Sequence, residues 1–199
     1  MVTVSIPAEL RTAVGTKFAK ADRKSGNIPA VIYGAKAEPM HITVKLKDVK
    51  PIIFTPDFKI AEVNVDGKVL KCIVKDTQFH AVNDQLSHID FLRLEDGHKI
   101  KIEVPVRFEG TSPGVKLGGK LIQSVRKVPL KTLPSAMVDV VKVSISSLEL
   151  GGTLRVKNIE LPEGNEILLN PSIPIANVEI PRALKSAAAE EKKAAPGKK

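Results

Sequence analysis

A two-residue turn between two alternating runs is the strongest constraint on the fold of this chain. The segment AEVNVDGKVLKCIV, residues 61–74, alternates apolar and polar residues on both sides of Asp66-Gly67. Alternation with a period of two is typical of a half-buried strand. An Asp-Gly pair between two such runs predicts a tight β-hairpin, because both residues tolerate the backbone that the turn requires.

Short segments with strand character recur along the chain. They are VTVSI, NIPAVIYG, MHITVKL and QLSHIDFLRL in the first half, then KIKIEVPVRFEG, LIQSVRKVPLKTL, VVKVSI, GTLRVKNIEL and PIANVEI. KDVKPIIF predicts a short helix, whose first residue Pro51 leaves open. Aromatic residues make up only 4% of the chain and tryptophan is absent. The core must therefore be aliphatic and rich in β-branched residues, which favours a mostly β protein.

The polar segment EDGH, residues 95–98, is the candidate domain boundary. It separates a predicted domain over residues 1–95 from a second all-β domain over residues 96–182, where turn signals follow each other at short spacing. Residues 183–199 contain mostly Ala, Lys and Glu, with nothing to bury. They predict a disordered basic tail.

The basic residues are concentrated in two segments. The net charge is +9, and one cluster lies in KFAKADRKSG, just before the only tyrosine of the chain, Tyr33. Lysine and arginine can neutralise phosphates, and a tyrosine can stack on a base or donate to a sugar or phosphate. A polyanion partner is one interpretation. The other is a solvated basic surface with Tyr33 at the rim of the core, and charge alone leaves both open.

Candidate catalytic chemistry is confined to HAVNDQLSHIDF, which contains His80, Asp84, His88 and Asp90. These residue types can bind metals, but their spacing matches no helical zinc motif. A structural or binding histidine is the better interpretation, and we expect no metal and no cofactor. The single Cys72 lies in an alternating run and predicts a reduced core residue. GVKLGGKL lacks the full phosphate-loop pattern and predicts a tight loop.

The chain shows no signal-peptide pattern and no apolar run near 18 residues. These observations predict a soluble, cytoplasmic protein without a membrane partner.

Four segments, in order, resemble one family. The pattern R-x3-G-x4-K-x2-R-x2-G-x-IPAVIYG, Arg11 to Gly34, resembles the opening of the bacterial large-subunit ribosomal protein L twenty-five family, also called the general stress protein CTC family. KDTQFHAVNDQLSHIDFLRL resembles the second signature of that family. VPVRFEGTSPGVKLGGKL and SSLELGGTLRVKNIELPEGNEIL resemble the C-terminal domain of its long form. The resemblance implies an N-terminal six-stranded type of β-barrel with short helices, followed by a C-terminal β domain.

The resemblance also implies a function. Members of this family bind 5S rRNA in the central protuberance of the large subunit, next to other rRNA and ribosomal proteins, and they have no catalysis and no small-molecule substrate. The RNA-binding residues implied here are Arg11, Lys17, Lys20, Arg23, Lys24, Tyr33, Lys75, Asp76, Gln78, His80, His88 and Asp90. On this interpretation His88 donates to RNA while it is neutral, and the strand NIPAVIYG holds the basic loop that precedes it.

Two departures from the family pattern stand out. The family commonly has serine followed by two arginines in the first basic segment, where this chain reads Ala19-Lys20-Ala21-Asp22. Lysine cannot grip a phosphate with two parallel bonds as arginine does, so we expect weaker or rearranged contacts. Phe79 stands where many relatives have a polar or basic residue, and it either stacks on a base or packs.

Two alternative functions remain beside the ribosomal one. The first is a stress-related module whose C-terminal domain binds proteins. The second is a metal-dependent hydrolase that uses His80, His88 and Asp90.

Overall fold

The computed structural model describes residues 1–34 and 38–181, which divide into two compact units. The first unit comprises Met1–Val104, Leu130–Asp139 and Glu163–Glu166, and the second comprises Pro105–Pro129, Val140–Pro162 and the described residues from Ile167 on. The domain boundary at residue 95 stays a prediction. The tail predicted over residues 183–199 lies outside the described residues.

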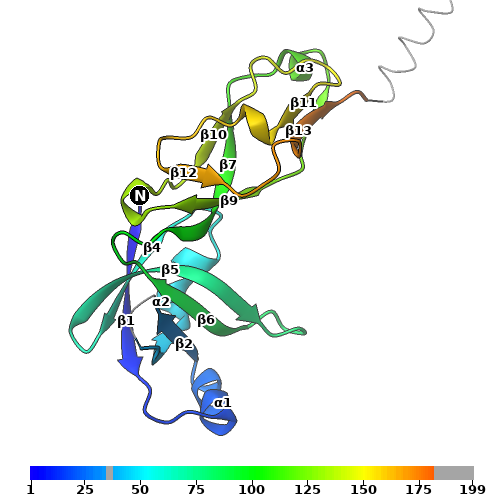
Figure 1. Ribbon diagram of the computed structural model, residues 1–199. Coiled ribbons are helices and arrows are strands. Elements are labelled where there is room, and N and C mark those ends of the chain that lie inside the picture. Colours follow the sequence, from blue (N-terminus) through cyan, green and yellow to red (C-terminus); the bar gives the residue numbers. More distant parts are fainter. Residues whose placement is uncertain (35–37, 182–199) are drawn as a thin grey trace, which may run out of the picture. The chain divides into compact units, whose positions relative to one another are not determined.

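The first unit contains a closed barrel of six strands, as the resemblance implies (Figure 1). Its order around the barrel is β1-β3-β2-β6-β5-β4. The strands are β1 (Thr3–Leu10), β2 (Asn27–Tyr33), β3 (Met40–Lys45), β4 (Ile60–Val65), β5 (Lys68–Phe79) and β6 (Leu86–Arg93), and the helices are α1 (Thr16–Lys24) and α2 (Leu46–Ile53). The predicted helix in KDVKPIIF is therefore confirmed as α2, with Pro51 inside it.

Side chains that alternate along the strands fill the barrel. The fully buried ones are almost all aliphatic, and include Ile6, Ile32, Ile42, Val63 and Ile89, with Phe91 as the one buried aromatic of this cluster. Cys72 is also fully buried in it, as predicted.

The β4–β5 hairpin turns at the predicted residues. Val65 pairs with Lys68, and Asp66 and Gly67 have φ values of 49° and 82°. Positive φ at both central residues is the geometry of a type I′ turn, which matches the twist of the flanking strands.

The strand β5 continues five residues past Val74, the end of the alternating run, and a β-bulge changes its register on the way. Val74 pairs with Phe91, but Asp76 pairs with Asp90, so Lys75 is an extra residue without a partner on β6. One extra residue exchanges the two faces of a strand. Even-numbered positions such as Cys72 face the core before the bulge, and Asp76 and Gln78 are exposed after it.

The basic segment before β2 is a helix, α1, and not the loop that the sequence predicted. The helix ends at Ser25, whose hydroxyl donates to the carbonyl oxygen of Asp22 at 2.8 Å, and at Gly26, which has a φ of 81°. These two residues satisfy backbone groups that the helix end would otherwise leave open.

The second half of the chain forms two small sheets with strand orders β10-β7-β9-β12 and β11-β13-β8. The strands are β7 (Ile100–Glu109), β8 (Lys120–Gln123), β9 (Lys127–Thr132), β10 (Val141–Ser144), β11 (Thr153–Arg155), β12 (Asn165–Ile167) and β13 (Pro174–Glu179). The single strand predicted in LIQSVRKVPLKTL is two strands, β8 and β9. A short helix, α3 (Pro113–Lys116), overlaps the start of GVKLGGKL, where the sequence predicted a tight loop. The mostly β class is confirmed.

Among the described residues, no helix has the length and apolar character needed to cross a membrane.

Candidate RNA interface

The outer face of β2, β6 and β5 gathers five of the twelve residues that the resemblance implies, which are Tyr33, Asp76, Gln78, His88 and Asp90. Gln78 of β5 lies opposite His88 of β6, and Asp76 lies opposite Asp90. On the other side of β6, Ala30 to Tyr33 of β2 run parallel to Ile89 to Leu92. Because Ile89 and Phe91 point into the core, His88 and Asp90 point outward. The face therefore presents polar groups on three adjacent strands.

His88 and Asp90 form a hydrogen-bonded pair on this face. The Nδ1 atom of His88 is 2.7 Å from Oδ1 of Asp90, and both side chains are partly buried. A carboxylate only accepts, so Nδ1 of His88 carries the proton that it donates. Nε2 of the neutral ring is then an acceptor. The expectation that neutral His88 donates to RNA is corrected by this geometry.

Tyr33 lies at the end of β2 on the same face. Burial raises the pKa of its hydroxyl, and the nearby carboxylates of Asp90 and Asp76 raise it further. The phenol therefore stays protonated and can donate a hydrogen bond to a phosphate or a base.

His80 stands at the tight turn that joins β5 to β6. Its backbone N–H donates to the carbonyl of Gln85 at 2.8 Å, and the N–H of Val82 donates to its Nδ1 at 3.3 Å. Nδ1 is thus an acceptor and Nε2 of the neutral ring carries the proton. His80 offers a donor where His88 offers an acceptor.

The helix α1 adds the positive charge. At about 100° per residue, Lys17, Lys20 and Lys24 fall within roughly 60° of arc on one side of the helix. All three are exposed, while Ala19 and Asp22, on the opposite side, are partly buried. Arg23 and Lys24 in the last turn also interact favourably with the helix dipole.

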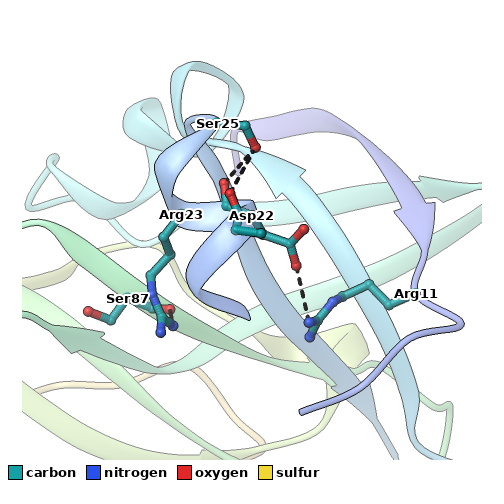
Figure 2. A network of polar contacts seen from close by, with 6 residues as sticks. Arg11, Asp22, Arg23, Ser25 and Ser87 are labelled. Carbon is teal, nitrogen blue, oxygen red and sulfur yellow. Dashed lines mark hydrogen bonds and ion pairs between the residues drawn. The ribbon is translucent and has the colours of Figure 1, made fainter. Parts of the chain in front are cut away.

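Two polar contacts tie α1 to the barrel, as Figure 2 shows. Nη2 of Arg11 is 3.1 Å from Oδ2 of Asp22. Nη1 of Arg23 donates to the carbonyl oxygen of Ser87 at 3.2 Å. Ser87 is the extra residue of a second bulge, since Gln78 pairs with His88 and Phe79 with Leu86. Arg11 and Arg23 thus make contacts within the protein.

Lys75 is a predicted residue whose ammonium group is engaged within the protein. It is the bulge residue of β5, and its ammonium group donates to the carbonyl oxygen of Lys101 at 3.0 Å.

Sequence reasoning missed His41 of β3. It pairs with Val31 of β2, it is exposed, and its neighbours in the strand point into the core. It therefore lies on the same outer face, and the alternation in MHITVKL was the signal that could have placed it.

Phe79 packs against Phe54 in an edge-to-face contact, with ring centroids 6.2 Å apart and an interplanar angle of 68°. Phe79 is 44% exposed and Phe54 is 59% exposed. The packing alternative is present in the structure, and part of each ring remains accessible.

Within residues 1–34 and 38–181, no group of three or more His, Cys, Asp and Glu side chains is arranged to hold a metal ion.

Comparison with known proteins identifies the family. Residues 6–91 match the Ribosomal L25p family, and residues 99–182 match the C-terminal domain of ribosomal protein TL5. The large ribosomal subunit protein bL25 of Cytophaga hutchinsonii is 40% identical over 186 residues, which cover 93% of this chain and 95% of that protein. The chain belongs to the bL25 family. The bL25 proteins of Amoebophilus asiaticus and Phocaeicola vulgatus are 35% and 33% identical, over 96% and 95% of this chain and 96% and 98% of their own lengths.

Membership of the bL25 family, in its two-domain form, makes the chain a component of the large ribosomal subunit. It is therefore cytoplasmic and bound to the ribosome, among rRNA and ribosomal proteins. The bL25 family is not catalytic, which confirms the prediction and removes the hydrolase alternative.

Proposed function

We propose that this bL25 chain binds 5S rRNA in the central protuberance of the large subunit, through the barrel face of β2, β6 and β5 together with α1. The observation that carries the proposal is the placement of the three α1 lysines beside a face of polar hydrogen-bonding groups. Arg23 contacts Ser87, so α1 lies at the start of β6, where Gln78 and His88 follow at once.

The helix α1 supplies the positive charge, and the barrel face supplies the hydrogen-bonding groups that recognise the RNA. The lysines of α1 neutralise phosphates without regard to sequence. From Ser87 to Leu92 the face extends about 16 Å at ~3.3 Å per residue, and along it Gln78, His88 and Tyr33 offer donors and acceptors. Such groups suit the wide, shallow minor groove of RNA, where base edges and 2′-hydroxyls are exposed.

The two carboxylates have compatible roles on an RNA surface. Asp90 holds the ring of His88 through Nδ1, and Asp76 accepts from the N–H of Thr77 at 2.8 Å. Each carboxylate retains further lone pairs that can accept from the amino groups of bases.

Titration of full-length protein into 5S rRNA tests the proposal, with an unrelated structured RNA of equal length as competitor. We expect Lys20→Ala and Lys24→Ala to weaken 5S binding and to reduce the slope of log K against log salt by about 0.7–0.9 for each phosphate that is no longer neutralised. Lys68→Ala is the matched control, because Lys68 is exposed at the β4–β5 turn. Equal affinity for both RNAs would contradict the proposal.

The N-terminal residues are expected to carry the affinity. Under this proposal, residues 1–95 alone retain 5S rRNA binding. If the chain is instead a module whose C-terminal domain binds proteins, its binding activity should disappear when residues 96–199 are removed.

A further inference from the structure

We propose that Asp22 is a positioning residue: its ion pair with Arg11 fixes α1 on the barrel so that the lysine side of the helix faces the RNA. This inference rests on the proposed function, since the RNA is the partner that the lysines meet. It reverses the expectation from the sequence, in which Asp22 is an unfavourable departure and Arg11 is a phosphate contact.

Apolar packing contributes little to the orientation of helix α1. All nine of its residues are described by the structure and none of them is buried. A helix of this length is marginal by itself in water, and most helices gain their stability from a buried apolar face. The direction in which α1 presents its lysines therefore depends largely on polar contacts with the barrel.

Arg11 is suited to hold the helix and poorly suited to bind a phosphate. Its backbone N–H donates to the carbonyl oxygen of His41 on β3 at 2.9 Å, which fixes the residue at the end of β1. Its side chain is only 11% exposed and reaches Asp22, which is 29% exposed, at 3.1 Å. An ion pair that is partly removed from solvent is screened less than one on the surface.

The contact between Arg23 and Ser87 completes the attachment. In the barrel order, β2 lies between β3 and β6. Arg11 is bonded to β3 and pairs with Asp22, whereas Arg23 bonds to β6. The helix is thus fastened on both sides of the strand that it precedes, as the side chains in Figure 2 illustrate. Two fixing points on opposite sides restrict rotation of α1, which a single contact would not.

The direction in which RNA affinity changes when Asp22 is replaced separates a positioning role from a purely electrostatic one. Replacement of Asp22 by asparagine removes a negative charge near the RNA-facing helix, so electrostatics alone predicts tighter RNA binding. Loss of the ion pair predicts weaker binding, because the lysines are then less well placed. Asparagine keeps the size of the side chain and has a similar helix propensity to aspartate. The substitution should therefore leave the helix itself unchanged, so that only the lost charge and the lost ion pair affect RNA binding.

The experiment measures full-length Asp22→Asn against wild type with 5S rRNA over a range of salt. We expect roughly three- to tenfold weaker binding, in the range of a partly buried ion pair, with a salt slope close to that of wild type. Asp22→Glu, which keeps the charge, should recover most of the affinity. Asp96→Asn, on the exposed turn after β6, is the matched control and should bind as wild type does. Unchanged or tighter binding by Asp22→Asn would overturn the proposal.

A second measurement needs no RNA. Amide hydrogen exchange over residues 16–24 of the unbound protein should be faster in Asp22→Asn and in Arg11→Ala than in wild type or Asp96→Asn. The double variant Arg11→Asp, Asp22→Arg swaps the two charges and should restore the ion pair. Its amide hydrogen exchange over residues 16–24 should return toward the wild-type rate. If wild type shows no preference for 5S rRNA, the proposed function fails. If exchange in α1 does not respond to Asp22→Asn, the positioning role fails, whatever the RNA result.

Discussion

Asp76 lies directly opposite Asp90 across the β5–β6 ladder, with both residues on the outer face of the barrel. Two like charges in facing positions of a sheet oppose each other. Each has its own partner, since Asp76 accepts from the N–H of Thr77 and Asp90 from the ring of His88. The juxtaposition exists because the bulge at Lys75 turns Asp76 outward.

The two carboxylates should be visible in the titration of Tyr33. Tyr33 is the only tyrosine and tryptophan is absent, so the near-ultraviolet absorbance of phenolate reports this residue alone. We expect a native pKa above the usual value of about 10. Asp76→Asn and Asp90→Asn should each lower it, because each removes a negative charge that disfavours phenolate. In the double variant, burial should still keep the pKa of Tyr33 above its ordinary value, because burial is the largest cause of the shift. A wild-type titration at that ordinary value would contradict the arrangement of this face.

The same pair predicts a stability effect. Asp76→Asn should raise the free energy of unfolding by no more than about 1 kcal/mol at low salt, because the repulsion from Asp90 disappears. Asparagine still accepts from Thr77. The gain should shrink as salt rises, since exposed charges are screened. Urea unfolding at low and high salt measures it, and Asp96→Asn controls for the change in net charge. A loss of stability would show that the charge of Asp76 has a favourable partner.

The elements with regular alternation could be predicted from sequence, and the irregular ones could not. NIPAVIYG and the hairpin at Asp66-Gly67 carry period-two patterns or turn residues, and the structure has them where they were expected. The bulge at Lys75 has no such signal, because a single extra residue leaves both flanking runs looking like strand. The helix α1 was missed because it is short and mostly polar, and none of its side chains is fully buried.

The candidate RNA interface could likewise be predicted only in part from the sequence. Charge and residue chemistry pointed to the basic segment, Tyr33 and the two histidines, and the family resemblance assigned them to one RNA-binding site. The structure explains why spacing alone would not assemble them. Gln78 and His88 are brought together by pairing of β5 with β6 across the turn at His80. The contact of Arg23 with the Ser87 carbonyl depends on a second bulge. The pairing of Arg11 with Asp22 depends on the path of the chain after β1.

Gly119 in GVKLGGKL should be intolerant of any side chain. A Cβ atom at this position would lie 2.4 Å from Cγ1 of Val178 and 2.7 Å from the carbonyl oxygen of Gly114. One of these neighbours is backbone, so the site cannot relax cheaply. We expect Gly119→Ala to destabilise the second unit by about 1–3 kcal/mol or more, as a lower midpoint in thermal unfolding. Gly34→Ala is the comparison, because its nearest neighbour, at 3.0 Å, is the end of the flexible Glu95 side chain. Equal effects of the two substitutions would refute this explanation.

Cys72 should make the fold sensitive to alkaline pH. Burial raises the pKa of its thiol to about 12, and nearby Arg93 lowers it by a smaller amount. In the unfolded chain the thiol ionises near its ordinary value of about 8.5. The neutral thiol therefore stabilises the fold fully below that pH, and this contribution is lost as pH rises toward 12. Cys72→Ala removes the effect but leaves the other titrating groups in place. Between pH 7 and pH 10 the stability difference between wild type and Cys72→Ala should narrow by about 2 kcal/mol, as measured by urea unfolding. A difference that is the same at both pH values would mean that Cys72 titrates equally in the folded and unfolded states.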